Sequence, residues 1–302
     1  MSVTPSHLGF GCSRLMGSLP RRQADRLLET SLALGITHFD VARSYGSGEA
    51  ERVVGSFAKR HDDVTITTKF GIAPSGAQQS QMLRGLARGL MRRSPALRRR
   101  LQDRGARMVT RGRFDLAAVQ ASVETSLTTL GLSSIHAALL HDPLPTDILD
   151  DETLDWLQER RAAGVIGVLG IGTGHDAARV LIEAQPAVCG VVQVPHSIDA
   201  SARDVFRTAV GRKVAFGVLS ESARFRVRYP HRVERAMAAV GAPPDDEEAL
   251  GVIALADAVS AGADKVLIST TNPDRLLGLP KRLETFGSSE VLDGFRAHLR
   301  LP

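Results

Sequence analysis

The chain has 302 residues, of which 43% are hydrophobic and 24% are charged, a composition ordinary for a soluble globular protein. No run of about 18 apolar residues is present, so we expect no membrane span. The N-terminus has no basic region followed by an apolar core, so we expect no secretory signal. The two cysteines, Cys12 and Cys189, fit no metal or redox spacing. We interpret both as reduced thiols of a cytoplasmic protein, and we predict no metal site.

The net charge of +5 is distributed unevenly along the chain. Residues 81–113 contain eleven arginines and one acid, Asp103, which gives this segment a charge of +10. The basic balance is therefore the property of one segment and says little about the rest of the protein. Leucines at helical spacing predict that residues 74–113 form a basic helical insertion, which Pro95 divides into two short helices.

Apolar and β-branched runs alternate with helical patterns along the chain. In chain order, the predicted strands are residues 7–10, 36–40, 64–68, 135–140, 165–171, 190–194, 214–218 and 264–268. The predicted helices are residues 21–34, 48–59, 116–130, 150–163, 176–184, 202–210, 231–240, 247–261, 273–277 and 290–299. A longer loop is expected between the seventh strand and residue 231.

Strict alternation of strands and helices predicts a parallel sheet, and eight such units allow closure into a single-domain (β/α)8 barrel over residues 1–302. An open doubly wound sheet is the alternative. That fold usually carries G-x-G-x-x-G after its first strand, but the turn at Gly9 and Gly11 has no third glycine at the required place. We therefore predict the barrel.

Three successive strand ends carry titratable side chains: Asp40, Lys69 and His141. Tyr45 follows Asp40 on the same loop. Because the carboxyl ends of barrel strands meet on one face, we expect these four side chains to converge. A neighbouring ammonium lowers the pKa of a phenol, so Lys69 is expected to lower that of Tyr45. Asp40 would keep Lys69 charged, and His141 would hydrogen-bond the phenol or the oxygen that is protonated. Tyr45 would then act as a general acid or base on a carbonyl or alcohol oxygen, and a redox reaction would need a cofactor.

The sequence resembles the aldo-keto reductase family, and the similarity is greatest to bacterial sugar or aldose dehydrogenase-type members. The matching motifs run in order along the chain: LGFG (8–11), GITHFDVARSYGSGEAE (35–51), TKFG (68–71), LLHDP (139–143), VQVPHS (192–197), VAFGVLS (214–220) and STTNPDR (269–275). The resemblance implies a barrel that binds a nicotinamide cofactor and passes hydride between it and an aldehyde, ketone or sugar. It also implies that Tyr45 exchanges the proton.

The resemblance further implies a set of cofactor contacts: Gly11, Asp40, Gly172, Thr173, Gln193, Phe216, Gly217, Leu219, Ser220, Thr270, Thr271 and Arg275. Leu219 and Ser220 would belong to a loop that covers the diphosphate. Gly172 and Thr173 replace a usual Ser-Asn pair, and Ser269 stands where many NADP-specific members have lysine. Because Arg275 could still bind a 2′-phosphate as a fork, we expect NADP(H), with NAD(H) as an alternative.

Other readings of these residues stay open. The chain could be a redox sensor that binds the cofactor and acts through a partner instead of a turnover enzyme. The arginine-rich segment could form a wall of the active site, or bind an anionic substrate or partner, or contact lipid or nucleic acid; without interleaved aromatic residues, nucleic-acid binding is not expected. His175 and His196 follow strand ends and either line the substrate site or are ordinary loop residues. The sequence does not specify an oligomeric state.

Overall fold

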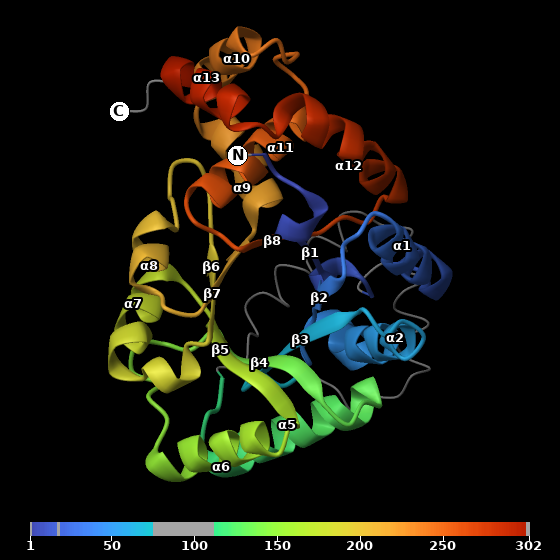
Figure 1. The fold of residues 1–302 in the computed structure, drawn as a ribbon, viewed down its shortest axis with the longest axis vertical. Coiled ribbons are helices and arrows are strands. Elements are labelled where there is room, and N and C mark those ends of the chain that lie inside the picture. The colour runs from blue at the N-terminus through green and yellow to red at the C-terminus, as the bar shows by residue number, and fades with distance from the viewer. Residues whose placement is uncertain (1, 17–18, 75–111, 300–302) are drawn as a thin grey trace, which may run out of the picture.

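The structure of the protein is a computed structural model, and it describes residues 2–16, 19–74 and 112–299. Parallel strands pair in chain order and close between β1 and β8 into an eight-stranded barrel (Figure 1). The strands are β1 (Leu8–Gly11), β2 (His38–Asp40), β3 (Thr65–Phe70), β4 (Ile135–His141), β5 (Ile166–Gly172), β6 (Val191–Pro195), β7 (Arg212–Phe216) and β8 (Lys265–Ile268). The predicted barrel is confirmed, and the open doubly wound sheet is excluded.

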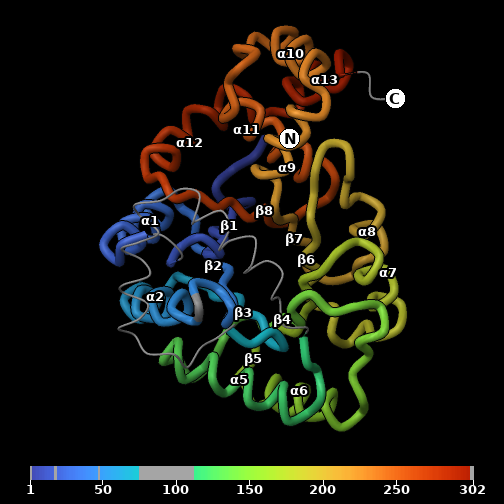
Figure 2. The backbone as a smooth tube through the Cα atoms, turned by 180° about the vertical axis from the view of Figure 1, so that it is seen from behind, coloured from blue at the N-terminus to red at the C-terminus, as the bar shows by residue number. Residues whose placement is uncertain are grey.

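Helices surround the barrel on its outer side, as the front and back views show (Figures 1 and 2). The described helices are α1 (Arg21–Ala33), α2 (Glu49–Ala58), α5 (Leu116–Leu130), α6 (Asp151–Ala162), α7 (His175–Ala184), α8 (Arg203–Thr208), α9 (Val218–Arg228), α10 (Pro230–Ala239), α11 (Glu247–Ser260), α12 (Pro273–Phe286) and α13 (Ser289–Leu299). Among these, α9, α11 and α12 pack beside one another, next to β8.

Local signals explain where several helices begin and end. Asp115, Asp150 and Asp246 precede α5, α6 and α11, and each carboxylate accepts a backbone N–H of the first turn. These bonds satisfy donors that a helix cannot pair internally. Gly131 ends α5 in the left-handed conformation that glycine adopts without strain.

The alternation of side chains along the strands separates two apolar regions. On β4, Ala138 and Leu140 belong to the large core between the barrel and its helices. Ala137 and Leu139 belong to a small cluster inside the barrel, together with Val191, Val214 and Leu267. Because side chains two residues apart share a face, the inner positions continue to the carboxyl ends of the strands. The inner side chains there are polar, namely Asp40, Lys69, His141, Gln193 and Ser269, and Gly172 leaves space among them.

Two regions differ from the sequence-based expectations. The loop expected after β7 is helix α9, which begins at Val218 directly after Gly217 in a left-handed conformation (φ 76°). Leu219 and Ser220 therefore lie in a helix, not in a loop. Helix α12 continues to Phe286 although Pro280 lies within it, since Leu276 and Leu283 are buried on either side of the proline. The predicted basic insertion at 74–113 lies almost entirely outside the described residues.

Candidate active site

The four titratable side chains predicted to converge do lie together at the carboxyl end of the barrel. Lys69 Nζ donates to Asp40 Oδ1 at 2.5 Å and lies 3.4 Å from the Tyr45 hydroxyl. The ring of His141 stands edge-on to that of Tyr45, with 5.8 Å between centroids and 87° between the planes. No hydrogen bond joins the two rings, and His141 Nδ1 is buried without a partner among the described residues.

Tyr45 is positioned by two short turns rather than by a strand. It begins the 3-10 turn η3 (Tyr45–Gly48), which packs against η2 (Cys12–Arg14) at the end of β1. Gly46 has a positive φ of 58°, and a Cβ there would lie 2.5 Å from the Cβ of Met16. A side chain at position 46 would therefore push against Met16, which follows η2, and displace the phenol beside it.

Lys69 and Asp40 form a buried ion pair. Their side chains are each only 4% exposed. Burial lowers the pKa of Lys69, but the attraction of Asp40 and Tyr45 outweighs it, so the net pKa is raised. Lys69 is therefore a cation at neutral pH, and Asp40 is its counter-charge.

The pKa of Tyr45 is shifted in the direction opposite to the sequence-based expectation. Burial raises the pKa of the phenol above its ordinary value of 10.0, and the charge of Lys69 offsets only part of this effect. The phenol is therefore protonated at neutral pH. Burial, with a contribution from Lys69, lowers the pKa of His141 to about 3, so its imidazole is neutral.

Gln193 on β6 extends the cluster toward the middle of the barrel. Its Nε2 donates to the second oxygen of Asp40 at 3.2 Å, while its Oε1 is buried without a partner among the described residues. A Cβ at Gly172, the neighbouring position on β5, would lie 3.1 Å from that oxygen. The glycine thus leaves free space beside an unsatisfied acceptor, which is the arrangement expected where a ligand donates a hydrogen bond.

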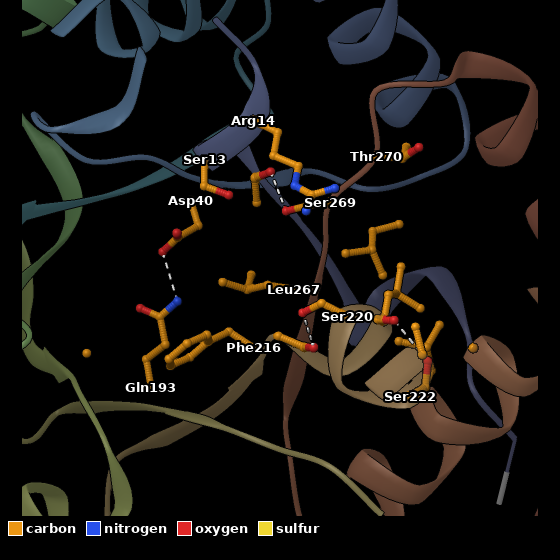
Figure 3. A pocket seen from close by; sticks show the side chains of 18 of the residues that line it. Ser13, Arg14, Asp40, Gln193, Phe216, Ser220, Ser222, Leu267, Ser269 and Thr270 are labelled. Atoms are coloured by element: carbon orange, nitrogen blue, oxygen red, sulfur yellow. Dashed lines mark hydrogen bonds between the residues drawn. The ribbon is translucent and has the colours of Figure 1, made fainter. Parts of the chain in front are cut away.

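A cavity of about 1020 Å³ opens over this cluster and extends toward α9, α11 and α12 (Figure 3). Most of the predicted cofactor contacts line it: Gly11, Asp40, Gly172, Thr173, Gln193, Phe216, Gly217, Leu219, Ser220, Thr270 and Arg275. Thr271 does not; its carbonyl accepts a hydrogen bond from Gln23. The Thr173 hydroxyl donates to the Pro143 carbonyl at 2.8 Å.

Several residues that line the cavity were not predicted from the sequence. Arg14 enters it from the turn after β1, and Figure 3 shows its side chain extending beside Ser269. Its position three residues after the strand end is the signal that could have identified it. Glu247 and Glu248 line the far end from the first turn of α11. No local pattern marks these two acids, because only tertiary packing brings α11 to the cavity.

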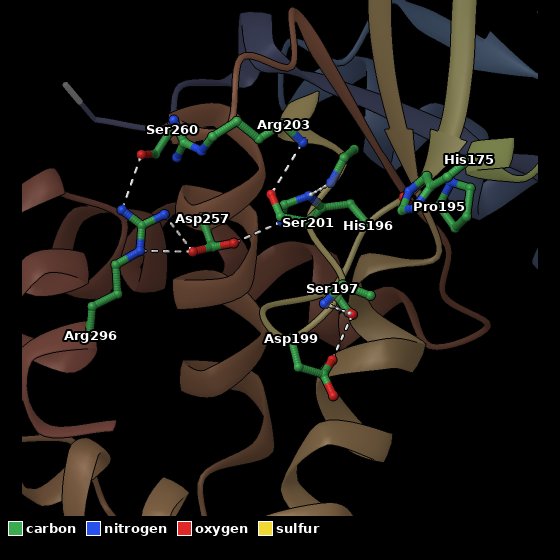
Figure 4. Close-up of polar contacts among 12 residues, drawn as sticks. His175, Pro195, His196, Ser197, Asp199, Ser201, Arg203, Asp257, Ser260 and Arg296 are labelled. Atoms are coloured by element: carbon green, nitrogen blue, oxygen red, sulfur yellow. Dashed lines mark hydrogen bonds and ion pairs between the residues drawn. The ribbon is translucent and has the colours of Figure 1, made fainter. Parts of the chain in front are cut away.

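His175 and His196 do not line the cavity, and their contacts are those of loop anchors (Figure 4). His196 is fully buried, with Nε2 2.8 Å from Asp257 Oδ2, and its Nδ1 accepts the backbone N–H of Ala202. Asp257 also pairs with Arg296 of α13. This chain of contacts joins the loop after β6 to two outer helices.

Cys12 and Cys189 are both buried and unpaired, as predicted. Burial raises the pKa of both thiols, that of Cys189 to about 11. Within the described ranges, no group of three or more side chains could hold a metal ion. In the same part of the chain, no helix is long and apolar enough to cross a membrane.

Comparison with known proteins agrees with this architecture. A model of the aldo/keto reductase family matches residues 7–214. The chain is 30% identical over 176 residues to a D-threo-aldose 1-dehydrogenase from a Pseudomonas species, covering 55% of this chain and 49% of that protein. It is 28% identical over 216 residues to a pyridoxal 4-dehydrogenase from Microbacterium luteolum, covering 65% and 60% respectively. The matches thus span about half to three-fifths of these curated relatives.

Among solved structures, the holo form of an aldo-keto reductase from Bacillus halodurans superposes with a TM-score of 0.71. The superposition covers 96% of this chain and 91% of that chain at 18% sequence identity. At this identity the likeness establishes the fold and carries no statement about substrate.

Proposed function

The chain belongs to the aldo/keto reductase family of oxidoreductases, and on that basis we propose that it interconverts a carbonyl compound and an alcohol with a nicotinamide dinucleotide as its cofactor. The observation that carries the proposal is the Tyr45 phenol, which lines the cavity and lies beside the buried Lys69–Asp40 ion pair. A phenol in this setting can give or accept a proton at a reacting oxygen.

The residues around the cluster fit the nicotinamide group. The unpartnered Gln193 Oε1 can accept an amide N–H of the carboxamide, and the ring of Phe216 lines the cavity close by, where it can stack on a flat ring. The Thr173 hydroxyl donates its hydrogen bond to the Pro143 carbonyl, but its oxygen can still accept one from a ligand. When bound, the cofactor supplies or takes up the hydride.

Side chains of the cluster would transfer a proton to and from the substrate oxygen. Because its pKa is raised, Tyr45 is protonated at neutral pH and can donate to the oxygen of a carbonyl substrate. The phenolate that results would lie 3.4 Å from the Lys69 ammonium, which stabilises it. His141 is neutral and can donate a hydrogen bond to the same oxygen, which would help to orient it. In the reverse direction, Tyr45 would accept the proton of an alcohol.

The proposed substrate class is a small carbonyl compound or a sugar. The two curated relatives are named for an aldose and for pyridoxal. The cavity is also large enough to hold a small molecule together with part of a dinucleotide.

Tyr45→Phe tests the proposal, and Tyr229→Phe is a matched control because Tyr45 and Tyr229 are the only two tyrosines of the chain. We expect Tyr45→Phe to lower kcat at least about 100-fold, the usual contribution of a general acid, while leaving the cofactor Kd within about twofold. The control should retain full activity. Turnover is followed by nicotinamide absorbance over a panel of aldehydes and sugars, and binding by fluorescence. Near-normal turnover of Tyr45→Phe would contradict the mechanism, and cofactor binding without turnover in the unmodified protein would favour the redox-sensor alternative.

A further inference from the structure

The far end of the cavity is lined by a network of paired charges on α11 and α12. Arg282 Nε lies 2.8 Å from Glu248 Oε2, and Arg282 also bonds Asp246 Oδ2 at 2.8 Å. Arg275 Nε lies 3.4 Å from the other Glu248 oxygen. Glu248 therefore stands between two arginines, with both carboxylate oxygens engaged.

The first turn of α11 holds this network in place. Asp246 caps α11 through the backbone N–H groups of Glu248 and Ala249, which fixes the first turn that carries Glu248. The contacts with Asp246 and Glu248 raise the pKa of Arg282, and the pKa of Asp246 is lowered by its contact with Arg282 and by the backbone N–H groups that it caps. The side chain of Glu248 is 36% exposed, so its carboxylate remains accessible from the cavity.

The charges of the α11–α12 network do not favour an additional phosphate. The positive charges of Arg275 and Arg282 are matched by those of Asp246 and Glu248, and Glu247 adds a further carboxylate along the cavity wall. Two more arginines line the cavity from α9, Arg224 and Arg226, and Arg224 is paired with Glu221. Arg275 is therefore not an isolated guanidinium, because its Nε is paired with Glu248. A carboxylate accepts a hydrogen bond from a ribose hydroxyl but repels a phosphate at the same place.

We infer that Glu248 selects a dinucleotide with a free 2′-hydroxyl, so that the protein prefers NAD(H) to NADP(H). This inference rests on the proposed function, because it assumes that the nicotinamide lies at Gln193 and the adenosine at the α11–α12 end. It favours NAD(H), the alternative that the sequence left open, over the NADP(H) that the sequence-based expectation put first. Arg14 enters the cavity from the turn after β1, and its side chain lies beside Ser269 (Figure 3). No ion pair joins Arg14 to the network within the described ranges, and the inference assigns its charge to a phosphate that both dinucleotides share.

The inference is tested by calorimetric titration with ADP-ribose and 2′-phospho-ADP-ribose, two ligands that lack nicotinamide and cannot react. The unmodified protein should bind ADP-ribose about tenfold more tightly, the effect expected from one carboxylate facing a phosphate across partly screened solvent. Glu248→Gln should remove that preference or reverse it, because it frees Arg275 and leaves Arg282 paired with Asp246 alone. Titrations with NADH and NADPH should follow the same order.

Two control variants test whether the preference depends on Glu248 itself. Glu247→Gln removes the same charge one residue away and should change the ratio of the two affinities by less than Glu248→Gln does. Arg14→Gln should weaken both ligands in parallel. The inference is overturned if the unmodified protein binds 2′-phospho-ADP-ribose more tightly, if Glu247→Gln and Glu248→Gln act equally, or if Arg14→Gln weakens only the phosphorylated ligand. Failure of NADH and NADPH alike to bind would instead refute the proposed function.

Discussion

Replacing Lys69 by methionine should destabilise the fold strongly, because it leaves Asp40 buried without its counter-charge. Both side chains are 4% exposed, and 2.5 Å separates Lys69 Nζ from Asp40 Oδ1. Methionine is close to the lysine stem in length, so the main loss is electrostatic. Breaking a buried pair by removing one partner costs about 3–5 kcal/mol.

Protonation of Asp40 would limit this loss. Without Lys69, Asp40 would keep one donor, Gln193 Nε2, and would reduce the cost of its buried charge by taking up a proton. Burial raises the pKa of Asp40, and loss of the Lys69 charge would raise this pKa further. Since the folded variant would bind this proton more tightly than the unfolded chain, its stability should fall as the pH rises from about 4 toward 7.

Urea unfolding of a double-mutant cycle measures the effect. The double variant Lys69→Met/Asp40→Asn removes both charges, so it should be more stable than the sum of the single losses predicts by at least about 2 kcal/mol. The control is Asp204→Asn in the exposed Arg207–Asp204 pair, whose side chains are 71% and 72% exposed and which should contribute less than about 1 kcal/mol. A loss below about 1 kcal/mol for Lys69→Met, or additive single losses, would refute the description of a buried ion pair.

Two further outcomes follow from the structure. Burial lowers the pKa of His38 and of His141 to about 3, so the unfolded chain, with histidine pKa near 6.5, takes up these protons first as the pH falls. The free energy of unfolding should therefore be highest above pH 6.5 and fall by about 2 kcal/mol per histidine at pH 5. Thermal unfolding at pH 7 and at pH 5 measures this fall, and His141→Gln should remove about half of it. Equal melting temperatures of the unmodified protein at the two pH values would contradict the prediction. Gly55→Ala should lower the free energy of unfolding in urea by about 1–3 kcal/mol, because the new Cβ would lie 2.1 Å from the Leu130 carbonyl oxygen and push α2 away from α5. An unchanged free energy of unfolding would show that the two helices can separate freely.

The sequence was sufficient for the barrel and for the four clustered side chains because both depend on local patterns. β-Branched runs of alternating burial mark the strands, and the topology alone brings a polar residue at the end of such a run to the carboxyl end of the barrel. Asp40, Lys69 and His141 needed no further information to be placed together. Tyr45 was placed correctly because it follows Asp40 within one short loop.

The features that the sequence did not predict depend on burial and on packing between distant elements, which no local pattern reveals. The raised pKa of Tyr45 follows from how deeply the phenol is buried, which a list of neighbouring charges does not contain. The pairing of Arg275 with Glu248 requires α11 and α12 to pack together. Helix α9 replaced an expected loop because Gly217 allows the chain to turn directly from β7 into a helix.

Asp40 links the two halves of the proposed chemistry through its two oxygens. A carboxylate can only accept, so Oδ1 holds the Lys69 ammonium and Oδ2 must face the Gln193 nitrogen. That second contact fixes the orientation of the Gln193 amide and leaves its oxygen directed at the space beside Gly172. One side chain on β2 thereby holds the Lys69 charge next to the phenol and orients the acceptor that the proposed nicotinamide would use. In the proposed reaction, a change at Asp40 should therefore impair proton transfer and cofactor binding together, whereas Tyr45→Phe should impair proton transfer alone.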